Sequence, residues 1–432
     1  MAEKEVGISR EKAKGFSIPK SDNRSIVIIG MLFFIFGFIT WLNSVLIPYL
    51  KIACELSNVQ AYLVAFSFYI SYFVMAIPSA WILKKVGFKR GMSLGLLVMA
   101  VGAVLFIPAA FSRTFSLFLL GLFVQGTGLA VLQTAANPYI TILGPIESAA
   151  KRISVMGVCN KFAGAVAPIV LGAIALKNVD TLVALLQTMS EIQKIEQLNA
   201  LALRVVWPYV IIAFVLLSLA FGVYKSGLPE IDDANVEDEN FGAENTQKTS
   251  IWQFPQLILG TLAMFLYVGV EVLAGDSVIS YGASQGIALS SAKFFATVTL
   301  VSMIVGYLIG IVLIPKYISQ KMALAVSALL GLFFTIMALI SHGFVSVLCI
   351  SLLGLANALV YPAIWPLAID GLGRYTKIGS SFLIMAIAGG AIIPVIYGFL
   401  ADSFSPRGAY MIALPAYLFI LAYALFYKKI KP

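Results

Sequence analysis

The stretch FPQLILGTLAMFLYVGVEVLAGDSVISYG, residues 254–282, decides the fold. Only two of its side chains, Glu271 and Asp276, carry a charge, and the rest is apolar or small. A helix of this length exceeds the roughly 30 Å thickness of a bilayer's hydrocarbon core. The stretch therefore predicts a transmembrane helix. Because a charge within hydrocarbon is costly, the two carboxylates need an explanation of their own.

Similar runs recur along the whole chain. The 432 residues are 60% hydrophobic and 11% charged, and the mean hydropathy is +0.97, which is too apolar for the surface of a soluble protein. We therefore predict an all-α membrane protein with twelve transmembrane helices. We expect them at residues 26–50, 58–83, 92–111, 115–143, 153–176, 204–224, 254–282, 292–314, 322–341, 343–369, 378–400 and 409–427.

The basic residues predict the orientation. If the N-terminus is cytoplasmic, inner segments hold 21 Lys and Arg residues and outer segments hold 7. This bias places both termini in the cytoplasm, with the chain in a bacterial inner membrane. The net charge of +9 then reflects the inner leaflet and requires no nucleic-acid partner.

No motif for catalysis or metal binding stands out in the sequence. Phosphate-binding glycine loops, zinc motifs and nucleophile elbows are not found, so we expect neither an enzyme nor a bound metal or cofactor. The three cysteines, Cys54, Cys159 and Cys349, lie in or beside apolar segments and are interpreted as packing residues. His342 falls in a short predicted turn at the surface.

The polar segment between the sixth and seventh helices divides the chain. We predict a cytoplasmic tail (1–25), a six-helix bundle (26–224), a cytoplasmic linker (225–253), a second six-helix bundle (254–427) and a short tail (428–432). The two halves also resemble each other at an offset of 226 residues. The matched pairs are Gly128 and Gly354, Leu129 and Leu355, Ala130 and Ala356, Lys151 and Lys377, Ser154 and Ser380, Gly164 and Gly390, Pro168 and Pro394, and Gly172 and Gly398.

Two parallel six-helix repeats joined by a cytoplasmic loop resemble the architecture of the major facilitator carriers. These carriers have a basic signature between helices 2 and 3, and AWILKKVGFKR, Ala80–Arg90, is similar to it. Gly87, Lys89 and Arg90 fit, whereas Lys84 stands where the family has an acidic residue. The resemblance implies alternating access around a site between the halves, usually in a working monomer.

Polar residues within the predicted helices indicate where that site lies. Amides, hydroxyls and aromatic faces suit a sugar, which needs hydrogen-bonding partners and a flat apolar surface. For each amide alone, the alternative is a structural hydrogen bond between helices. The predicted sugar contacts are Asn43, Gln133, Asn137, Asn160, Asn357, Tyr361 and Trp365.

Three segments resemble the fucose:proton symporter family of bacterial sugar carriers: WLNSVLIPYL (41–50), LQTAANPYITILGP (132–145) and KIGSSFLIMAIAGGAIIPVIYGF (377–399). FLYVGVEV (265–272) looks more like the glucose/galactose branch. The resemblance implies transport of fucose, glucose and galactose, or N-acetylglucosamine. Fucose permeases carry acidic residues where this chain has Ser44 and Gln133, so their proton relay does not carry over.

Glu271 and Asp276 are the only carboxylates deep within a predicted span, and we predict that they couple a cation to transport. Five residues of regular helix would point them roughly 140° apart. Gly269, Gly275 and Gly282 suggest local unwinding, which would let their oxygens and opened carbonyls bind sodium; a proton is the other choice. The alternative is a structural ion pair, most obviously with Lys161.

The sequence thus predicts a secondary active importer of a neutral hexose of the glucose or galactose type, coupled to sodium or to a proton. Alternatives are an N-acetylglucosamine or fucose carrier of the same family, or a facilitator without ion coupling.

Overall fold

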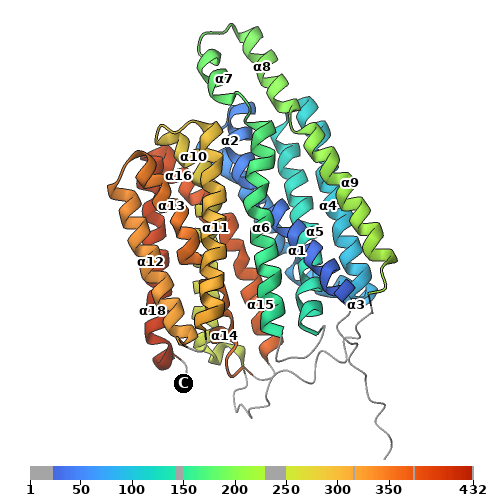
Figure 1. Cartoon of the computed structure of the whole chain (residues 1–432), viewed down its shortest axis with the longest axis vertical. Coiled ribbons are helices and arrows are strands. Elements are labelled where there is room, and N and C mark those ends of the chain that lie inside the picture. Colours follow the sequence, from blue (N-terminus) through green and yellow to red (C-terminus); the bar gives the residue numbers. More distant parts are fainter. Residues whose placement is uncertain (1–22, 143–148, 229–249, 315–316, 373–374, 431–432) are drawn as a thin grey trace, which may run out of the picture.

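The computed structural model describes residues 23–142, 149–228, 250–314, 317–372 and 375–430. Within these ranges every regular element is a helix, and twelve segments are long and apolar enough to cross a membrane (Figure 1). The predicted all-α fold with twelve transmembrane helices is confirmed. Helices suit this role because they satisfy their backbone hydrogen bonds internally, as a lipid environment requires.

The first half of the chain supplies six of these spans. They are formed by α1 (Asn23–Trp41) with α2 (Asn43–Ala53), α3 (Asn58–Val86), α4 (Phe88–Ser112), α5 (Phe115–Ile142), α6 (Ala149–Ala175) and α9 (Val206–Lys225). Between α3 and α4 the chain turns through Gly87 alone, at a φ of 79° that favours glycine.

The second half supplies the other six spans. They are formed by α10 (Pro255–Ser284), α11 (Leu289–Leu313), α12 (Gln320–Ile340), α13 (Gly343–Asn357) with α14 (Val360–Ile369), α15 (Thr376–Met385) with α16 (Gly389–Ser403), and α18 (Ala413–Ile430). Short helices η3 (Ile251–Gln253), η5 (Ala386–Ala388), α17 (Pro406–Ala409) and η6 (Tyr410–Ile412) complete the described part. Most of the predicted linker, and most of the N-terminal tail, lie outside the described residues, so the domain boundaries stay a prediction.

After α6 comes a helical hairpin that was not predicted from the sequence. It consists of α7 (Val179–Leu186) and α8 (Glu191–Leu203), and it projects from the end of the molecule opposite the C-terminus (Figure 1). We call this end the distal end. Ser190 and Gln193 form a capping box at the start of α8. The hydroxyl of Tyr49 on α2 donates to the carbonyls of Leu201 and Ala202, at 2.9 and 2.8 Å, and so fixes the end of α8.

The helices of each half pack mainly among themselves, and the two bundles meet along a seam formed by α3 with α16, α6 with α11, and α2 with α10. Figure 1 shows α6 beside α11. The predicted repeat is visible in this seam. Gly172 on α6 packs against Lys293 on α11, and its match Gly398 on α16 packs against Tyr62 on α3. Both glycines therefore allow close approach of helices at symmetry-related points.

Three spans are interrupted near the middle of the molecule. The first breaks between α1 and α2 at Leu42, the tenth between α13 and α14 at residues 358–359, and the eleventh passes through the 3-10 turn η5. The residues at these points keep right-handed helical dihedrals, so the interruptions are local irregularities within continuous spans. Carriers place binding sites at irregular points of spanning helices, so these positions mark the region to search for a site.

Candidate functional site

Lys161 and Glu271 form an ion pair across the seam. Lys161 lies on α6 and Glu271 on α10, and the Lys161 Nζ atom is 2.9 Å from Glu271 Oε1. Each side chain is 12% exposed. The alternative named from the sequence, a pair between these two residues, is therefore present. Because the partners belong to different bundles, the pair forms only while the bundles are in contact at this level.

Aromatic rings surround the pair. The Lys161 Nζ atom lies 4.7 Å from the ring centroid of Trp41, at the end of α1. The hydroxyls of Tyr267, Tyr307 and Tyr361 lie within electrostatic range of Glu271. Of these four, only Tyr361 was predicted. Trp41 belongs to the motif WLNSVLIPYL and Tyr267 lies one turn from Glu271, so the sequence positions of both could have indicated that they lie near the site. The position of Tyr307 gave no such indication.

Asp276 differs from Glu271 in its burial and in its lack of a partner. It is fully buried, and neither carboxyl oxygen has a hydrogen-bond partner among the described residues. The prediction that a regular helix would point the two carboxylates apart holds.

The predicted unwinding of this span is wrong, because α10 runs as one helix from Pro255 to Ser284. Its glycines serve packing instead. A Cβ atom at Gly269 would collide with Ile393, and one at Gly275 would collide with the ring of Trp41. The glycines were correctly noticed, but a close helix contact explains them better than a break does.

Two of the predicted sugar contacts lie at breaks in other helices. Asn43 is the first residue of α2, fully buried, and neither amide atom has a partner in the described part of the chain. The neighbouring Ser44 hydroxyl donates to the carbonyl of Trp41 at 2.8 Å and so stabilises the break. Asn357 ends α13, and its Oδ1 accepts from the Tyr417 hydroxyl at 2.9 Å.

Two predicted aromatic contacts stand together on α14. Tyr361 and Trp365 are one turn apart, both half-buried, with ring centroids 5.7 Å apart. Tyr361 also lies 6.4 Å from Tyr267 on α10, centroid to centroid. These rings thus connect the break at Asn357 with the helix that carries Glu271 and provide the flat apolar surface that a sugar ring needs.

The remaining predicted contacts lie on α5 and α6. The Asn160 Nδ2 atom donates to the Phe33 carbonyl on α1 at 3.3 Å, which is the structural role named as its alternative. Gln133 is half-buried on α5. The side chain of Asn137 lies outside the described residues.

Carboxylates close the distal end of the seam. Asp402, at the end of α16, accepts from the backbone N–H groups of Asn58 and Val59 at the start of α3, at 3.1 and 2.9 Å. Asp180 on α7 accepts from the backbone N–H groups of Leu289 and Ser290 at the start of α11, at 2.7 and 3.2 Å.

Each of these two contacts joins one bundle to a helix N-terminus of the other, where the free N–H groups and the helix dipole attract an anion. The two contacts lie at similar places in the two halves, since α7 follows α6 and α16 is the match of α6, although the aspartates themselves are not matched at the 226-residue offset. We call them the distal latches.

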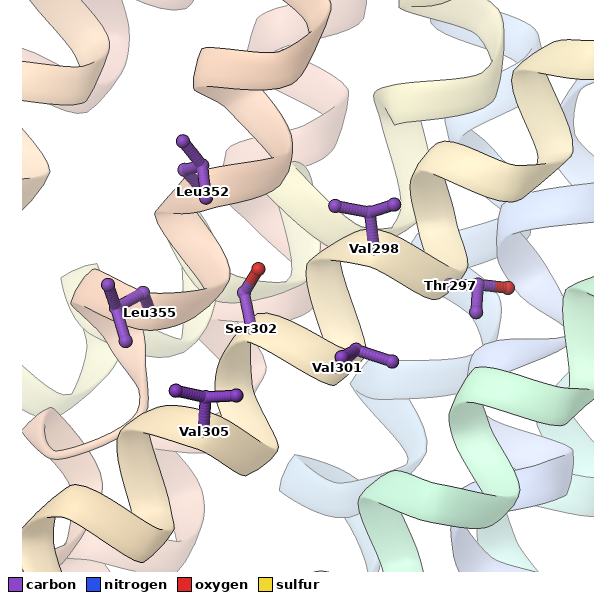
Figure 2. A pocket seen from close by; sticks show the side chains of 7 residues that line it. All are labelled: Thr297, Val298, Val301, Ser302, Val305, Leu352 and Leu355. Atoms are coloured by element: carbon purple, nitrogen blue, oxygen red, sulfur yellow. The ribbon is translucent and has the colours of Figure 1, made fainter.

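A cavity of about 280 Å³ lies away from this region, between α11 and α13. Figure 2 shows its lining, which is aliphatic apart from the hydroxyls of Thr297 and Ser302. Thr297 donates to the carbonyl of Ala165 at 2.8 Å. Val301 and Val305 are about half exposed, at 47% and 45%, so the hollow opens to the outside of the bundle. It contains none of the predicted site residues.

Comparison with known proteins agrees with this arrangement. Residues 29–386 match the family described as Major Facilitator Superfamily. A glucose/galactose transporter of Brucella abortus is 34% identical over 422 residues, covering 96% of this chain and 95% of the relative. The L-fucose-proton symporter of Escherichia coli is 33% identical over 381 residues, covering 86% and 85%.

A crystal structure of the transporter FucP in the outward conformation superimposes with a TM-score of 0.69 at 31% identity, covering 93% of this chain and 98% of that one. The chain therefore belongs to the major facilitator superfamily, and it has the transporter fold of two six-helix bundles.

Proposed function

We propose that this superfamily member imports a neutral hexose of the glucose or galactose type by alternating access, coupled to a cation. The relative named as a glucose/galactose transporter supports the substrate class, since it matches nearly the whole length of the chain. The relative named as a proton symporter supports coupling and favours a proton over sodium.

One observation carries the proposal: the ion pair between Lys161 and Glu271 bridges the two bundles and is bordered by the Trp41 ring. Trp41 and the unpaired amide of Asn43 lie at the α1–α2 break, and Asn357, whose Nδ2 is unpaired among the described residues, lies at the α13–α14 break. Such a set suits the hydroxyls and the apolar face of a sugar. Movement of one bundle relative to the other would separate Lys161 from Glu271. Changes at the site would therefore be coupled to the opening and closing of the carrier.

The proposed sugar contacts on the first bundle are Asn43, Gln133, Asn137 and Asn160. On the second bundle they are Asn357, Tyr361 and Trp365. Asn43 supports this assignment most directly, because a buried amide with two unpaired atoms is costly unless a ligand or water satisfies it.

We also propose the orientation. The bias of basic residues supports a cytoplasmic location for both termini, so the distal end would face the outside of a bacterial inner membrane. The closed distal latches then correspond to a carrier that is sealed on its outer side.

The test is counterflow in proteoliposomes that contain the purified full-length chain. Vesicles loaded with unlabelled sugar are diluted into a trace of the labelled sugar, with D-glucose, D-galactose, L-fucose and N-acetylglucosamine assayed separately. We expect transient uptake with glucose or galactose, and at least tenfold less in vesicles containing Asn43→Leu, which removes both amide atoms.

Counterflow with L-fucose alone would instead make the chain a fucose carrier, the function of its Escherichia coli relative. Absence of counterflow with all four sugars, in protein that remains folded in detergent, would reject sugar transport. Uptake that does not change with any imposed ion gradient would show that the chain is a facilitator without ion coupling.

A further inference from the structure

The two carboxylates of α10 have their charges balanced in different ways. Glu271 has a partner while the two bundles are in contact, because Lys161 supplies a positive charge at 2.9 Å. Asp276 has none: it is fully buried and both of its oxygens lack a hydrogen-bond donor within the described residues. An unpaired carboxylate in such a place is strongly destabilised, whereas the neutral acid is tolerated.

Within the described part of the chain, no basic group is recorded as acting on Asp276. On its own helix the group within electrostatic range is Glu271, another carboxyl. On α3 of the other bundle, Tyr62 and Tyr69 lie within electrostatic range. The neighbouring Ser277 is bonded to the Tyr410 hydroxyl. Tyrosines are neutral at physiological pH, and Lys161 is already engaged by Glu271.

Asp276 also lies at the seam between the two bundles, so it is shielded from water when the seam closes. It is five residues beyond Glu271, about 7.5 Å further toward the distal end. The adjacent Gly275 packs against the ring of Trp41 in the other bundle. Tyr62, in turn, makes an edge-to-face contact with Tyr397 of α16, at 5.3 Å between centroids. Separation of the bundles at this end would therefore bring the carboxyl toward outside water.

We infer that Asp276, rather than Glu271, is the carboxyl that couples a proton to transport. This inference rests on the proposed function. With the distal seam open, the Asp276 carboxylate takes a proton from water on that side. Only the neutral acid is compatible with the closed seam, so the distal end closes on the protonated form.

The proton leaves in the opposite direction. From Asp276 it passes to water that reaches the carboxyl once the bundles separate on the side of the termini, because Glu271 lies five residues away on a continuous helix and points in another direction. The charge that remains on Asp276 then destabilises the closed distal seam. The empty carrier consequently reopens toward the distal side, which completes the cycle.

The surroundings fit a proton better than sodium. A hard cation requires several oxygen ligands. The backbone carbonyls of α10 are used within one continuous helix, and no hydrogen-bonding side chain of the described residues contacts the Asp276 oxygens. A single carboxyl in apolar surroundings binds a proton but provides no coordination shell.

The experiment compares accumulation with exchange in proteoliposomes containing the full-length chain, with D-glucose and D-galactose as probes. For one proton per sugar, about two pH units drive up to about 100-fold accumulation, because each unit is a factor of ten. In Asp276→Asn we expect the accumulation ratio to fall to one, while counterflow stays within about threefold of the wild type. Sugar added to weakly buffered wild-type vesicles should also make the external medium more alkaline, and Asp276→Asn should abolish this change.

The matched control is Ser280→Ala. Ser280 lies one turn further along α10 and has a buried, unpaired hydroxyl, but it does not titrate. We expect this variant to accumulate sugar as the wild type does. Accumulation by Asp276→Asn at the wild-type level would overturn the inference, as would accumulation by the wild type with a sodium gradient alone. Loss of both counterflow and accumulation in folded Asp276→Asn would assign Asp276 a structural role and overturn it too.

A second measurement needs no variant. A membrane-soluble carbodiimide reacts with protonated carboxyls in apolar surroundings, so at neutral pH we expect an adduct on Asp276 and none on Glu271, with the modified residue located by fragmentation of the peptide that contains both. An adduct confined to Glu271 would reverse the assignment. If the wild type shows no counterflow with any sugar, the proposed function fails; if counterflow persists without proton movement, only this inference fails.

Discussion

The distal latches allow a quantitative prediction about access. Asp180 caps α11, whose own N-cap residue Ala288 makes no side-chain hydrogen bond. Asp402 accepts from the N–H groups of Asn58 and Val59 in the first turn of α3, in addition to that helix's own capping box of Ser57 and Gln60. Loss of an N-cap costs about 1 kcal/mol, within a range of about 0.5–2. Because each cap exists only while the bundles touch, its loss destabilises the closed seam and leaves the open seam unaffected.

The expected shifts follow from that figure. Asp402→Ala or Asp180→Ala alone should raise the ratio of open to closed carrier about fivefold, and the double variant about 30-fold, since about 1.4 kcal/mol is a factor of ten. The two latches lie on different helix pairs and share no side chain, so their effects should add. Replacement by Asn keeps an acceptor but removes the charge, so it should give a smaller shift.

Cysteine labelling measures this ratio. Tyr62 is 3% exposed and faces Tyr397 across the seam, so a cysteine placed at 62 reacts only when the seam opens. With Cys54, Cys159 and Cys349 replaced, the rate of reaction with a membrane-impermeant maleimide should scale with the open population.

Glu196→Ala is the matched control for the latches, because Glu196 is an exposed acid on α8. An unchanged labelling rate in the double latch variant, or a change in the control of the same size, would refute the proposed latches.

Three further predictions concern the core of the site and its edge. Lys161→Met or Glu271→Gln should each lower the melting temperature in detergent, because removal of one partner of a buried pair costs about 3–5 kcal/mol. The combined Lys161→Met and Glu271→Leu variant should recover much of this lost stability but should not recover transport. A double variant less stable than either single variant would contradict this. Gly389→Ala should prevent assembly or lower the melting temperature sharply, since its Cβ atom would lie 1.8 Å from the Phe265 carbonyl oxygen; an unchanged value would show that the helices can move apart. Burial raises the pKa of the Cys54 thiol to about 11, so the thiolate is scarce at pH 8. Alkylation of Cys54 by iodoacetamide, followed by mass spectrometry, should therefore be slow at pH 8 and become faster as the pH rises. Fast alkylation at pH 8 would mean that the thiol is not desolvated.

The twelve spans could be predicted from the sequence because each depends on local hydropathy alone. Predicted and observed bounds agree within a few residues for most helices, including 343–369 in both. The hairpin α7–α8 was missed because it combines polar and apolar residues and its stability comes from contact with Tyr49, which is far away in the sequence. Its capping box, Ser190 with Gln193, was a signal that hydropathy does not register.

The breaks show where sequence reasoning failed and why. Glycines in α10 suggested unwinding, yet α10 is continuous. Two of the interrupted spans break beside Asn43 and Asn357 without a glycine at the break, whereas the third passes from η5 directly into Gly389. A glycine removes a side chain and therefore serves either a bend or a close contact, and only the position of Trp41 opposite Gly275 decides between them. The pair of Lys161 with Glu271 could be named from the sequence because few charges lie within the spans, but its geometry could not.

The energies of the seam suggest why cargo can control it. Two latches contribute about 2 kcal/mol to the closed state, and a ligand that binds the open state about 100-fold more tightly than the closed one supplies about 2.7 kcal/mol. The difference in sugar-binding free energy between the open and closed states is thus large enough to open or close the distal end. The buried charges set a stricter condition, since Lys161 and Glu271 can part only where water or sugar hydroxyls replace their contact, and Asp276 can be covered only when neutral. Weak latches therefore permit movement, whereas the charges decide which loaded forms can complete it.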